Sequence, residues 1–232
     1  MIVIPATLAA VAGRPVNANM ASIVKGLAML PSGIEQPQRL ARFLGQTCHE
    51  SLGWTYDREI WGNTPAQLRY DIRTDLGNTA ARDGDGYLYR GRTGIQITGK
   101  ANTTAFRNWC QTQFSTLVPD FVVTPDLMNT DPWEGLGPVW YWSTHIYLGK
   151  HINDWCDVGD DVAVSRAING GDNGLADRLL KTVTASVLLC GFASIRAFQA
   201  AHMLAADGVA GPITRGVLHK VMCALPPVTF AA

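Results

Sequence analysis

The stretch that decides the fold is PQRLARFLGQTCHESLGWTYDREI, residues 37–60. At about 100° per residue its apolar side chains form one stripe along a helix. The stripe consists of Leu40, Phe43, Leu44, Thr47 and Cys48. Glu50 falls at the margin of this stripe, His49 points to the opposite side, and Gly53 is a stop signal of the C-cap kind. We therefore predict an amphipathic, half-buried helix that packs on the core of the protein.

Two acids in this stretch indicate acid–base chemistry. Glu50 lies in the last turn of the predicted helix, where partial burial and the negative end of the helix dipole favour a neutral carboxyl group that can act as a general acid. Glu59 follows nine residues later, beyond a Gly-Trp break, and a loop of that length can set a second carboxylate across a cleft. One neutral and one ionised carboxyl group are what glycosidic bond cleavage needs. The pair alone is also compatible with two ordinary surface acids.

Composition limits the class of protein. The 232 residues suffice for one sizeable domain with a small appendage, and a hydrophobic share of 47% is typical of a soluble globular protein. The formal net charge of zero argues against binding nucleic acid through bulk charge and leaves uncharged polymers such as sugars open. The N-terminal run IVIPATLAAVAG has no preceding basic residue and is interrupted by Pro5, so we expect no signal peptide. No run approaches the ~20 apolar residues of a membrane span.

The cysteines argue against metal chemistry. They lie at positions 48, 110, 156, 190 and 223 and form no CxxC pair. The His49-Glu50 dipeptide is followed by Gly53 where a zinc-binding helix needs its second histidine. Neither structural zinc nor zinc-protease chemistry is expected, and scattered single cysteines fit folding in a reducing cytoplasm.

Helical patterns cover most of the remaining chain. We predict short helices around 4–11 and 20–30, one helix between residues 64 and 78 that ends at Gly77-Asn78, and further helices over 162–168 and 175–189. Asp131-Pro132-Trp133-Glu134 has the form of a helix start with Asp131 as N-cap. The aromatic residues that follow are expected in the core.

The clearest strand signal is YLYRGRTGIQITGKAN, residues 87–102. Alternation sends Ile95 and Ile97 to one face, so that Gln96 and Thr98 face a cleft or solvent if the isoleucines enter the core. These glycines do not form a phosphate loop, because Lys100 is followed by Ala101 instead of Ser or Thr. Residues 191–232 form a separate helix–turn–helix pattern around Asp207-Gly208 and Gly211-Pro212, without an acid pair, and should bind or pack.

Four blocks together resemble glycoside hydrolase family 19, and the bacteriophage and prophage endolysins more than the plant chitinases. They are HES at 49–51, Glu59, DGYLYRGRTGIQITGKAN at 85–102 and SRAINGGDNGLADR at 165–178. The resemblance covers roughly residues 35–180. The C-terminal unit resembles a short peptidoglycan-binding domain. We therefore divide the chain into a catalytic domain, 1–190, and a peptidoglycan-binding-like motif, 191–232.

The resemblance implies a lysozyme-like α+β fold, predominantly helical and two-lobed, with a small β-hairpin or sheet and a substrate cleft. Glu50 would be the general acid, Glu59 the general base, and Thr98 would hold the attacking water, with inversion at the anomeric carbon and carboxyl groups roughly 6.5–9.5 Å apart. Expected substrate-binding residues are Gln96, Asn102, Asn169, Arg178, His49 and Tyr89. The chain departs from the family at Thr93, where GRG is usual, and at Thr103, where Asn-Tyr is usual.

The predicted function is an endolysin that hydrolyses the β-1,4 bonds of peptidoglycan glycan strands during host lysis. The alternatives are a chitinase acting on N-acetylglucosamine polymer, a lytic transglycosylase, which Glu59 argues against, and a non-catalytic wall-binding protein. We expect no cofactor or metal, no nucleic acid partner, no membrane insertion and a monomer. The protein would reside in the host cytoplasm and reach the periplasmic wall after a separate phage protein permeabilises the membrane.

Overall fold

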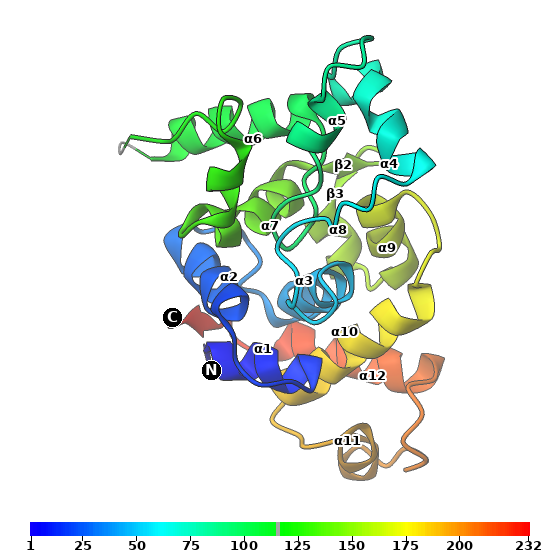
Figure 1. Cartoon of the computed structure of the whole chain (residues 1–232). Coiled ribbons are helices and arrows are strands. Elements are labelled where there is room, and N and C mark those ends of the chain that lie inside the picture. Colours follow the sequence, from blue (N-terminus) through cyan, green and yellow to red (C-terminus); the bar gives the residue numbers. More distant parts are fainter. Residues whose placement is uncertain (115–116) are drawn as a thin grey trace.

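A computed structural model describes residues 1–114 and 117–232 of the chain, which are mostly helical (Figure 1). The α-helices are α1 Pro5–Ala12, α2 Ala18–Met29, α3 Pro37–Glu50, α4 Pro65–Arg69, α5 Asp85–Leu88, α6 Lys100–Gln113, α7 Trp133–Thr144, α8 Ile152–Asp157, α9 Asp161–Asn169, α10 Leu175–Leu189, α11 Ile195–Ala201 and α12 Pro212–Ala224. Three short 3-10 helices are η1 Tyr70–Ile72, η2 Thr74–Leu76 and η3 Pro125–Asn129. The predicted predominantly helical α+β class with small sheets is confirmed.

The sheets are minimal and tie distant segments together. Strand β1 (Ile2–Val3) pairs in parallel with β4 (Thr229–Phe230), and β2 (Ile146–Tyr147) pairs antiparallel with β3 (Lys150–His151). The two termini therefore lie side by side (Figure 1). Of the described helices, none combines the length and the apolar character that crossing a membrane would require.

Helix α3 lies at the centre of the molecule and packs along α10. The predicted apolar stripe is buried, with Leu40, Phe43 and Leu44 all 0% exposed. The two helices approach so closely that a Cβ on Gly45 would overlap the Thr182 hydroxyl. Only a glycine permits this contact between the helices.

Helix α3 is more deeply buried than an amphipathic surface helix, which corrects the half-buried expectation. Even the polar Arg42 and Gln46 are buried, 4% and 2% exposed. Arg42 Nε lies 2.8 Å from Asp161 Oδ1, and Gln46 Nε2 donates to Ser165 Oγ at 2.9 Å, so α9 supplies polar partners for the face that the helical wheel assigned to solvent.

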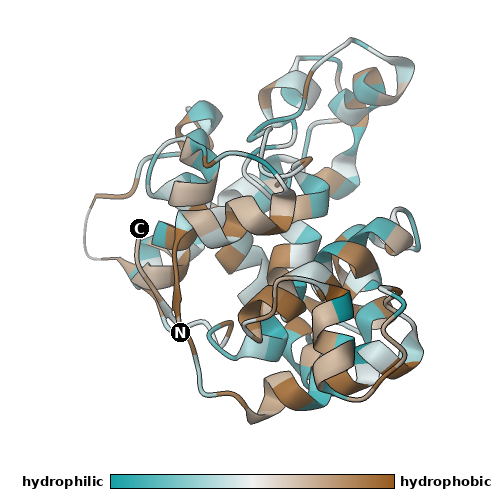
Figure 2. Cartoon of the chain, turned by 90° about the horizontal axis from the view of Figure 1, so that it is seen from below, coloured by the Kyte–Doolittle hydropathy of each residue, from teal (hydrophilic) through white to brown (hydrophobic). Residues whose placement is uncertain are grey.

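Helix α7 separates two hydrophobic clusters. Val139 and Trp142 face the larger cluster around α1, α2, α3, α8 and α10, whereas Leu136 and Trp140 face a smaller, aromatic one. The rings of Phe106, Phe121, Trp133 and Trp140 make up much of the smaller cluster. Figure 2 shows hydrophobic and hydrophilic positions alternating along the helices, with many hydrophobic positions turned toward neighbouring helices. The core role expected of the aromatic residues that follow residue 134 is confirmed for Trp140 and Trp142, which are 7% and 0% exposed.

Two other local expectations differ from the structure. The residues between 64 and 78 form α4, η1 and η2 instead of one helix, although Gly77 ends them in the left-handed conformation at φ 77°. Asp131 is not the cap of α7, because its carboxylate accepts a hydrogen bond from Ser22 Oγ at 2.5 Å and pairs with Lys25 at 3.3 Å. The carboxylate thereby links the start of α7 to α2.

The C-terminal segment packs against the rest of the chain. Phe198 of α11 and Leu218 of α12 bury themselves with Val183 and Val187 of α10. Met222 and Val228 belong to the large central cluster, and the Val228 amide donates to the Glu35 carbonyl at 2.8 Å. The helix–turn–helix pattern of residues 191–232 is thus anchored to α10 and to the N-terminal strand.

Glu134, 3% exposed in α7, should make folding stability depend on pH. Burial, followed by the charge of Asp57, raises the pKa of Glu134 well above its usual range. Because the unfolded residue ionises near its ordinary pKa, rising pH charges the unfolded chain first, and stability falls as pH climbs toward the folded pKa. We expect Glu134→Gln to raise the melting temperature relative to the parent by a few degrees more at pH 8 than at pH 5. An equal change at both values would contradict this account.

Candidate active site

The carboxyl group of Glu50 sits at the C-terminal end of α3, against the first turn of α10. Its side chain is 20% exposed, and Arg178 Nη2 donates to its Oε1 at 2.5 Å. Arg178 is 3% exposed and also donates through Nη1 to Gln46 Oε1 at 2.7 Å and through Nε to the Asn173 carbonyl at 3.1 Å. A buried guanidinium with three acceptors is held in one orientation, so it fixes the orientation of the Glu50 side chain.

Gln46 is a site residue that the sequence analysis missed. It lies four residues before Glu50, on the same face of α3, and the two side chains share Arg178. That i, i+4 spacing of two polar residues within an apolar helix was the available signal.

Two predicted binding residues support Arg178 instead of facing an open pocket. Asn169 ends α9, and its Nδ2 donates to the carbonyls of Gly171 and Asn173 at 3.1 and 3.0 Å. His49 Nδ1 lies 2.7 Å from Asp177 Oδ2. Asn169 therefore shapes the turn that presents the Asn173 carbonyl to Arg178, and His49 links the end of α3 to the first turn of α10. Their expected contact with substrate stays a prediction.

Glu59 is held by neutral groups. Its backbone amide donates to the Gly91 carbonyl at 2.8 Å, and the Gly91 amide donates back to Glu59 Oε2 at 3.2 Å. Gln67 Nε2 donates to Glu59 Oε1 at 3.0 Å, a contact that no pattern in the sequence predicts. Glu50 thus has a cationic partner, whereas the partners of Glu59 are an amide side chain and a backbone amide.

The segment expected as a strand is a tight turn. Residues 93–96 form the turn, which is closed by the bridge between Arg92 and Ile97, and Gln96 adopts φ 57°. The buried Arg92 fixes its base, because its guanidinium bonds to Asp126 and to the carbonyls of Leu88 and Arg90. Pairing of this segment is limited to isolated bridges, from Arg92 to Ile97 and from Arg92 to Arg58.

The predicted division of side chains in this turn nevertheless holds. Ile95 and Ile97 are 7% and 4% exposed and belong to the aromatic cluster. Gln96, Thr98 and Asn102 line a cavity of about 170 Å³. Thr98 Oγ1 donates to the Gln96 carbonyl at 2.9 Å, and Asn102 Nδ2 donates to the Thr98 carbonyl at 3.0 Å. Three of the expected site residues therefore share one pocket.

Tyr141 connects this cavity with Glu50, although the sequence analysis assigned the aromatic residues of its helix to the core. It lines the cavity, and its hydroxyl donates to the Ala167 carbonyl at 3.3 Å. Burial raises the pKa of Tyr141 to about 12, and the negative charge of nearby Glu50 acts in the same direction. The tyrosine is a neutral hydroxyl at working pH.

Tyr89 does not line the cavity that Gln96, Thr98 and Asn102 share. It is 4% exposed, and its hydroxyl donates to the Val122 carbonyl at 3.0 Å. The expected contact of Tyr89 with substrate has no support in this geometry, because the only polar atom of its side chain is bonded inside the protein.

Gly91 joins the two halves of the site. It exchanges hydrogen bonds with Glu59, and a Cβ at this position would lie 2.6 Å from Gln96 Oε1 and 3.3 Å from Thr98 Oγ1. Glu59 on one side and Thr98 on the other therefore approach the same glycine.

The substitution Gly91→Ala tests this geometry. The new methyl group must displace Gln96 and crowd Thr98, and misplacement of catalytic groups by a fraction of an ångström lowers the rate. We expect kcat/KM to fall about tenfold with little change in melting temperature, because the displaced group is the end of a flexible side chain. The control is Gly62→Ala, where the nearest side-chain atoms lie 3.8 Å from the added carbon. Full activity in Gly91→Ala would contradict the arrangement.

Two curated proteins are similar to the chain in sequence. Chitinase 8 of rice (Oryza sativa subsp. japonica) is 29% identical over 156 residues, 58% of this chain and 51% of its own length. A "Glycosyl hydrolase family 19 domain-containing protein" of Haemophilus influenzae is 34% identical over 103 residues, 44% of each chain. The chain thus spans about half the length of the curated relatives it matches. No protein-family model matches the chain.

Solved structures extend the similarity over most of the chain. Chitinase C from Streptomyces griseus HUT6037 superposes with a TM-score of 0.59 at 19% identity, covering 81% of this chain and 76% of that one. A bacterial family 19 chitinase gives 0.58 at 20% identity, covering 80% and 93%. The chain therefore has the fold of the family 19 chitinases and is similar in sequence to glycosyl hydrolase family 19 proteins.

Proposed function

We propose that the protein is an inverting glycoside hydrolase of the family 19 type. The observation that carries the proposal is the pair of carboxyl groups in unlike surroundings, Glu50 against a guanidinium and Glu59 against neutral donors beside Gly91 and Thr98. Glu50 protonates the glycosidic oxygen. Glu59 accepts a proton from a water that Thr98 holds, and that water attacks the opposite face of the sugar.

The contact with Arg178 has a role in this mechanism. In our proposal the bound sugar covers Glu50 and excludes water from it while its carboxyl group passes a proton to the leaving oxygen. Once the proton has moved to the leaving oxygen, Arg178 stabilises the carboxylate that remains.

For the substrate we propose the β-1,4-linked glycan of peptidoglycan, cut by an endolysin during phage lysis. The support is the likeness of the four sequence blocks to endolysins and of residues 191–232 to a wall-binding unit. The protein would act on the wall after a separate phage protein has permeabilised the membrane. The alternative substrate is chitin, which the names of the rice and Streptomyces relatives favour.

Glu50→Gln and Glu59→Gln test the acid and the base. Each removes a proton-transfer group, so each should lower the rate at which murein is hydrolysed by at least about 100-fold while the melting temperature changes little. Release of soluble sugar from purified murein and from colloidal chitin measures the rate and the preferred polymer. The matched control is Asp57→Asn, two residues from Glu59. If Glu59→Gln stayed active while Asp57→Asn did not, the base would be Asp57.

The C-terminal unit offers an apolar surface for wall binding. Met203, Val209 and Ile213 are 95%, 61% and 75% exposed and line a cavity of about 350 Å³ between α11 and α12. Beneath it the buried Gln199 fixes the turn, because it donates to Asp207, Val209 and Thr214 and accepts from the Gly208 amide. We propose that this surface contacts the glycan chain.

Point changes test the surface better than deletion, because removal of residues 193–232 would also remove Met222 and Val228 from the core. The double variant Val209→Asp/Ile213→Asp should reduce cosedimentation with insoluble murein at least about fivefold by removing apolar contact area. Its melting temperature should match that of the control Leu148→Asp, an exposed leucine elsewhere. If cosedimentation were undiminished, the C-terminal unit would only pack against the rest of the chain and would not bind murein through this surface.

A further inference from the structure

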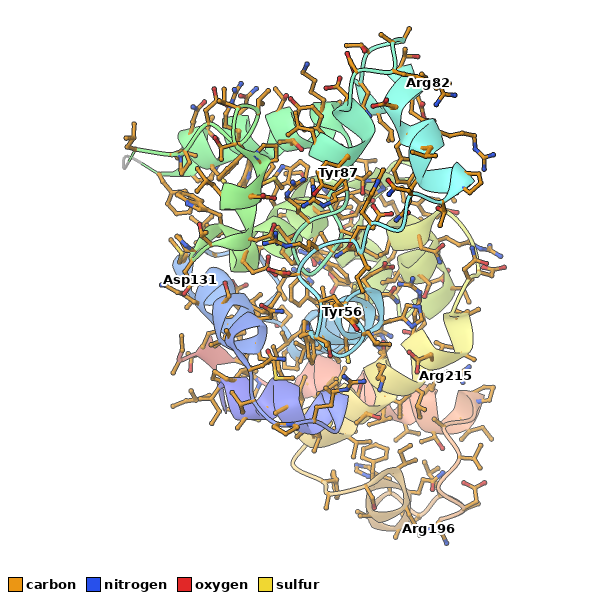
Figure 3. All side chains as sticks on the ribbon, viewed as in Figure 1. Tyr56, Arg82, Tyr87, Asp131, Arg196 and Arg215 are labelled. Carbon is orange, nitrogen blue, oxygen red and sulfur yellow. The ribbon has the colours of Figure 1, made fainter. Side chains whose placement is uncertain are left out.

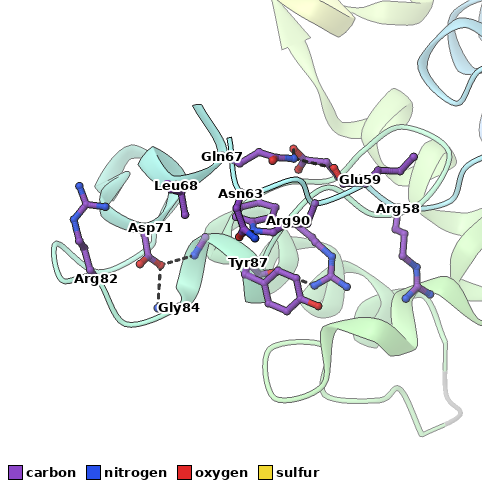
Figure 4. A pocket seen from close by; sticks show the side chains of 13 residues that line it. Arg58, Glu59, Asn63, Gln67, Leu68, Asp71, Arg82, Gly84, Tyr87 and Arg90 are labelled. Atoms are coloured by element: carbon purple, nitrogen blue, oxygen red, sulfur yellow. Dashed lines mark hydrogen bonds between the residues drawn. The ribbon is translucent and has the colours of Figure 1, made fainter. Parts of the chain in front are cut away.

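A large pocket that Glu59 also lines lies outside the arrangement of Glu59, Gly91 and Thr98. It measures about 730 Å³ and lies between α4, η1 and α5 (Figure 4). Arg58, Arg82 and Arg90 line it together with Trp61 and Tyr87. In Figure 4 Arg82 and Arg58 lie at opposite ends, with Arg90 and Tyr87 between them. Figure 3 places Arg82 and Tyr87 in the same lobe, far from Arg196 of the C-terminal unit.

The arginines of this pocket have donors to spare. Arg82 forms no ion pair with any residue that the structure describes, and Arg58 lies 3.6 Å from Asp57 and 3.9 Å from Asp126, beyond a good hydrogen bond. Asp126 is already bonded at 2.7 Å by the buried Arg92, which lowers its pKa, and Arg90 lies 3.7 Å away from the same oxygen. The Asp126 carboxylate thus lies near the guanidinium groups of three arginines and is bonded directly only to that of Arg92.

The acids that line the pocket accept hydrogen bonds from within the protein, Glu59 through both carboxylate oxygens and Asp71 through one. Asp71 Oδ1 accepts from the amides of Gly84 and Gly86 at 3.0 and 2.8 Å. Glu59 accepts from Gln67 and Gly91. Unused guanidinium donors beside carboxylates that already accept hydrogen bonds favour a ligand that brings its own negatively charged oxygen atoms.

The aromatic residues of the pocket favour a sugar. Tyr87 is 53% exposed, Arg90 Cζ lies 4.1 Å from its ring centroid, and Trp61 meets the ring edge-on at 5.6 Å. Exposed, rigidly supported rings supply apolar contact area for a saccharide ring, while neighbouring polar groups fix its orientation.

We infer that this pocket is a specificity subsite for a carboxylate-bearing sugar unit, namely the muramyl peptide of peptidoglycan, whose stem carries free carboxylates. Chitin is uncharged at every residue and would leave Arg58 and Arg82 without a partner. The inference rests on the proposed function and deepens it, because it gives the physical reason for preferring peptidoglycan over chitin. Arg58 and Arg82 are then specificity residues in a pocket that Glu59 also lines.

Binding by the full chain carrying Glu50→Gln, which prevents turnover, tests the subsite. The two probes are a GlcNAc–MurNAc tetrasaccharide with dipeptide stems and the same saccharide with its stem carboxylates amidated, each titrated by calorimetry. We expect the carboxylate form to bind roughly fivefold more tightly, as for partly exposed charge-assisted contacts, and the ratio to shrink as salt is added. In Arg58→Gln/Arg82→Gln the ratio should fall to about one. The control Arg69→Gln, an exposed arginine of α4 outside the pocket, should keep it.

Equal binding of the two probes, no binding, or a ratio that survives the double substitution in a folded variant would overturn the subsite. Hydrolysis by the unsubstituted chain separates this result from a failure of the proposed function. If that chain still digests murein, only the subsite is wrong. If it digests neither murein nor chitin, the proposed hydrolase function is wrong as well.

Discussion

The hydrogen bonds of one buried guanidinium determine the geometry of the candidate site. Arg178 enters from α10 and bonds to Gln46 and Glu50 on α3 and to the Asn173 carbonyl, so two central helices and the turn between α9 and α10 meet at a single charge. Leaving such a buried charge without partners costs several kcal/mol, which makes this one arrangement strongly preferred. The close contact at Gly45 and the buried faces of α3 and α10 also favour this one packing arrangement of the two helices.

The position of the second carboxylate, that of Glu59, depends on hydrogen bonds between loops. Glu59 lies in a loop without regular structure of its own, and it is placed by Gly91 and Gln67, which belong to segments later in the chain. The turn at residues 93–96, fixed by the buried Arg92, brings Thr98 to the same glycine. One side of the site therefore rests on helix packing and the other on a network of loop hydrogen bonds.

Much of this could be predicted from periodicity. The helices at the N-terminus, α3, α9 and α10 follow from apolar spacing and from glycines such as Gly170, which adopts φ 74° directly after α9. The inward isoleucines at 95 and 97 follow from alternation, even though the segment is a turn and not a strand. The alternating pattern predicts which side chains are buried, and this burial does not require the segment to pair as a strand.

Contacts between distant residues could not be predicted in this way. The helical pattern predicts that the polar face of α3 is exposed to solvent. In the structure Asp161 and Ser165 cover it. Asp131 has the form of a helix cap, but tertiary bonds to Ser22 and Lys25 compete for its carboxylate. Gln46, Gln67 and Tyr141 are unremarkable in sequence, and only the fold shows that they surround the two acids.

The anomeric configuration of the first product tests the central claim most directly. Proton NMR of the newly released reducing end, recorded within the first turnovers on a soluble glycan, distinguishes the two anomers before mutarotation. An acid at Glu50 and a water-activating base at Glu59 predict the α-anomer from a β-linked substrate. Initial release of the β-anomer, or of an anhydro sugar without a reducing end, would contradict the assignment of Glu59 as the base.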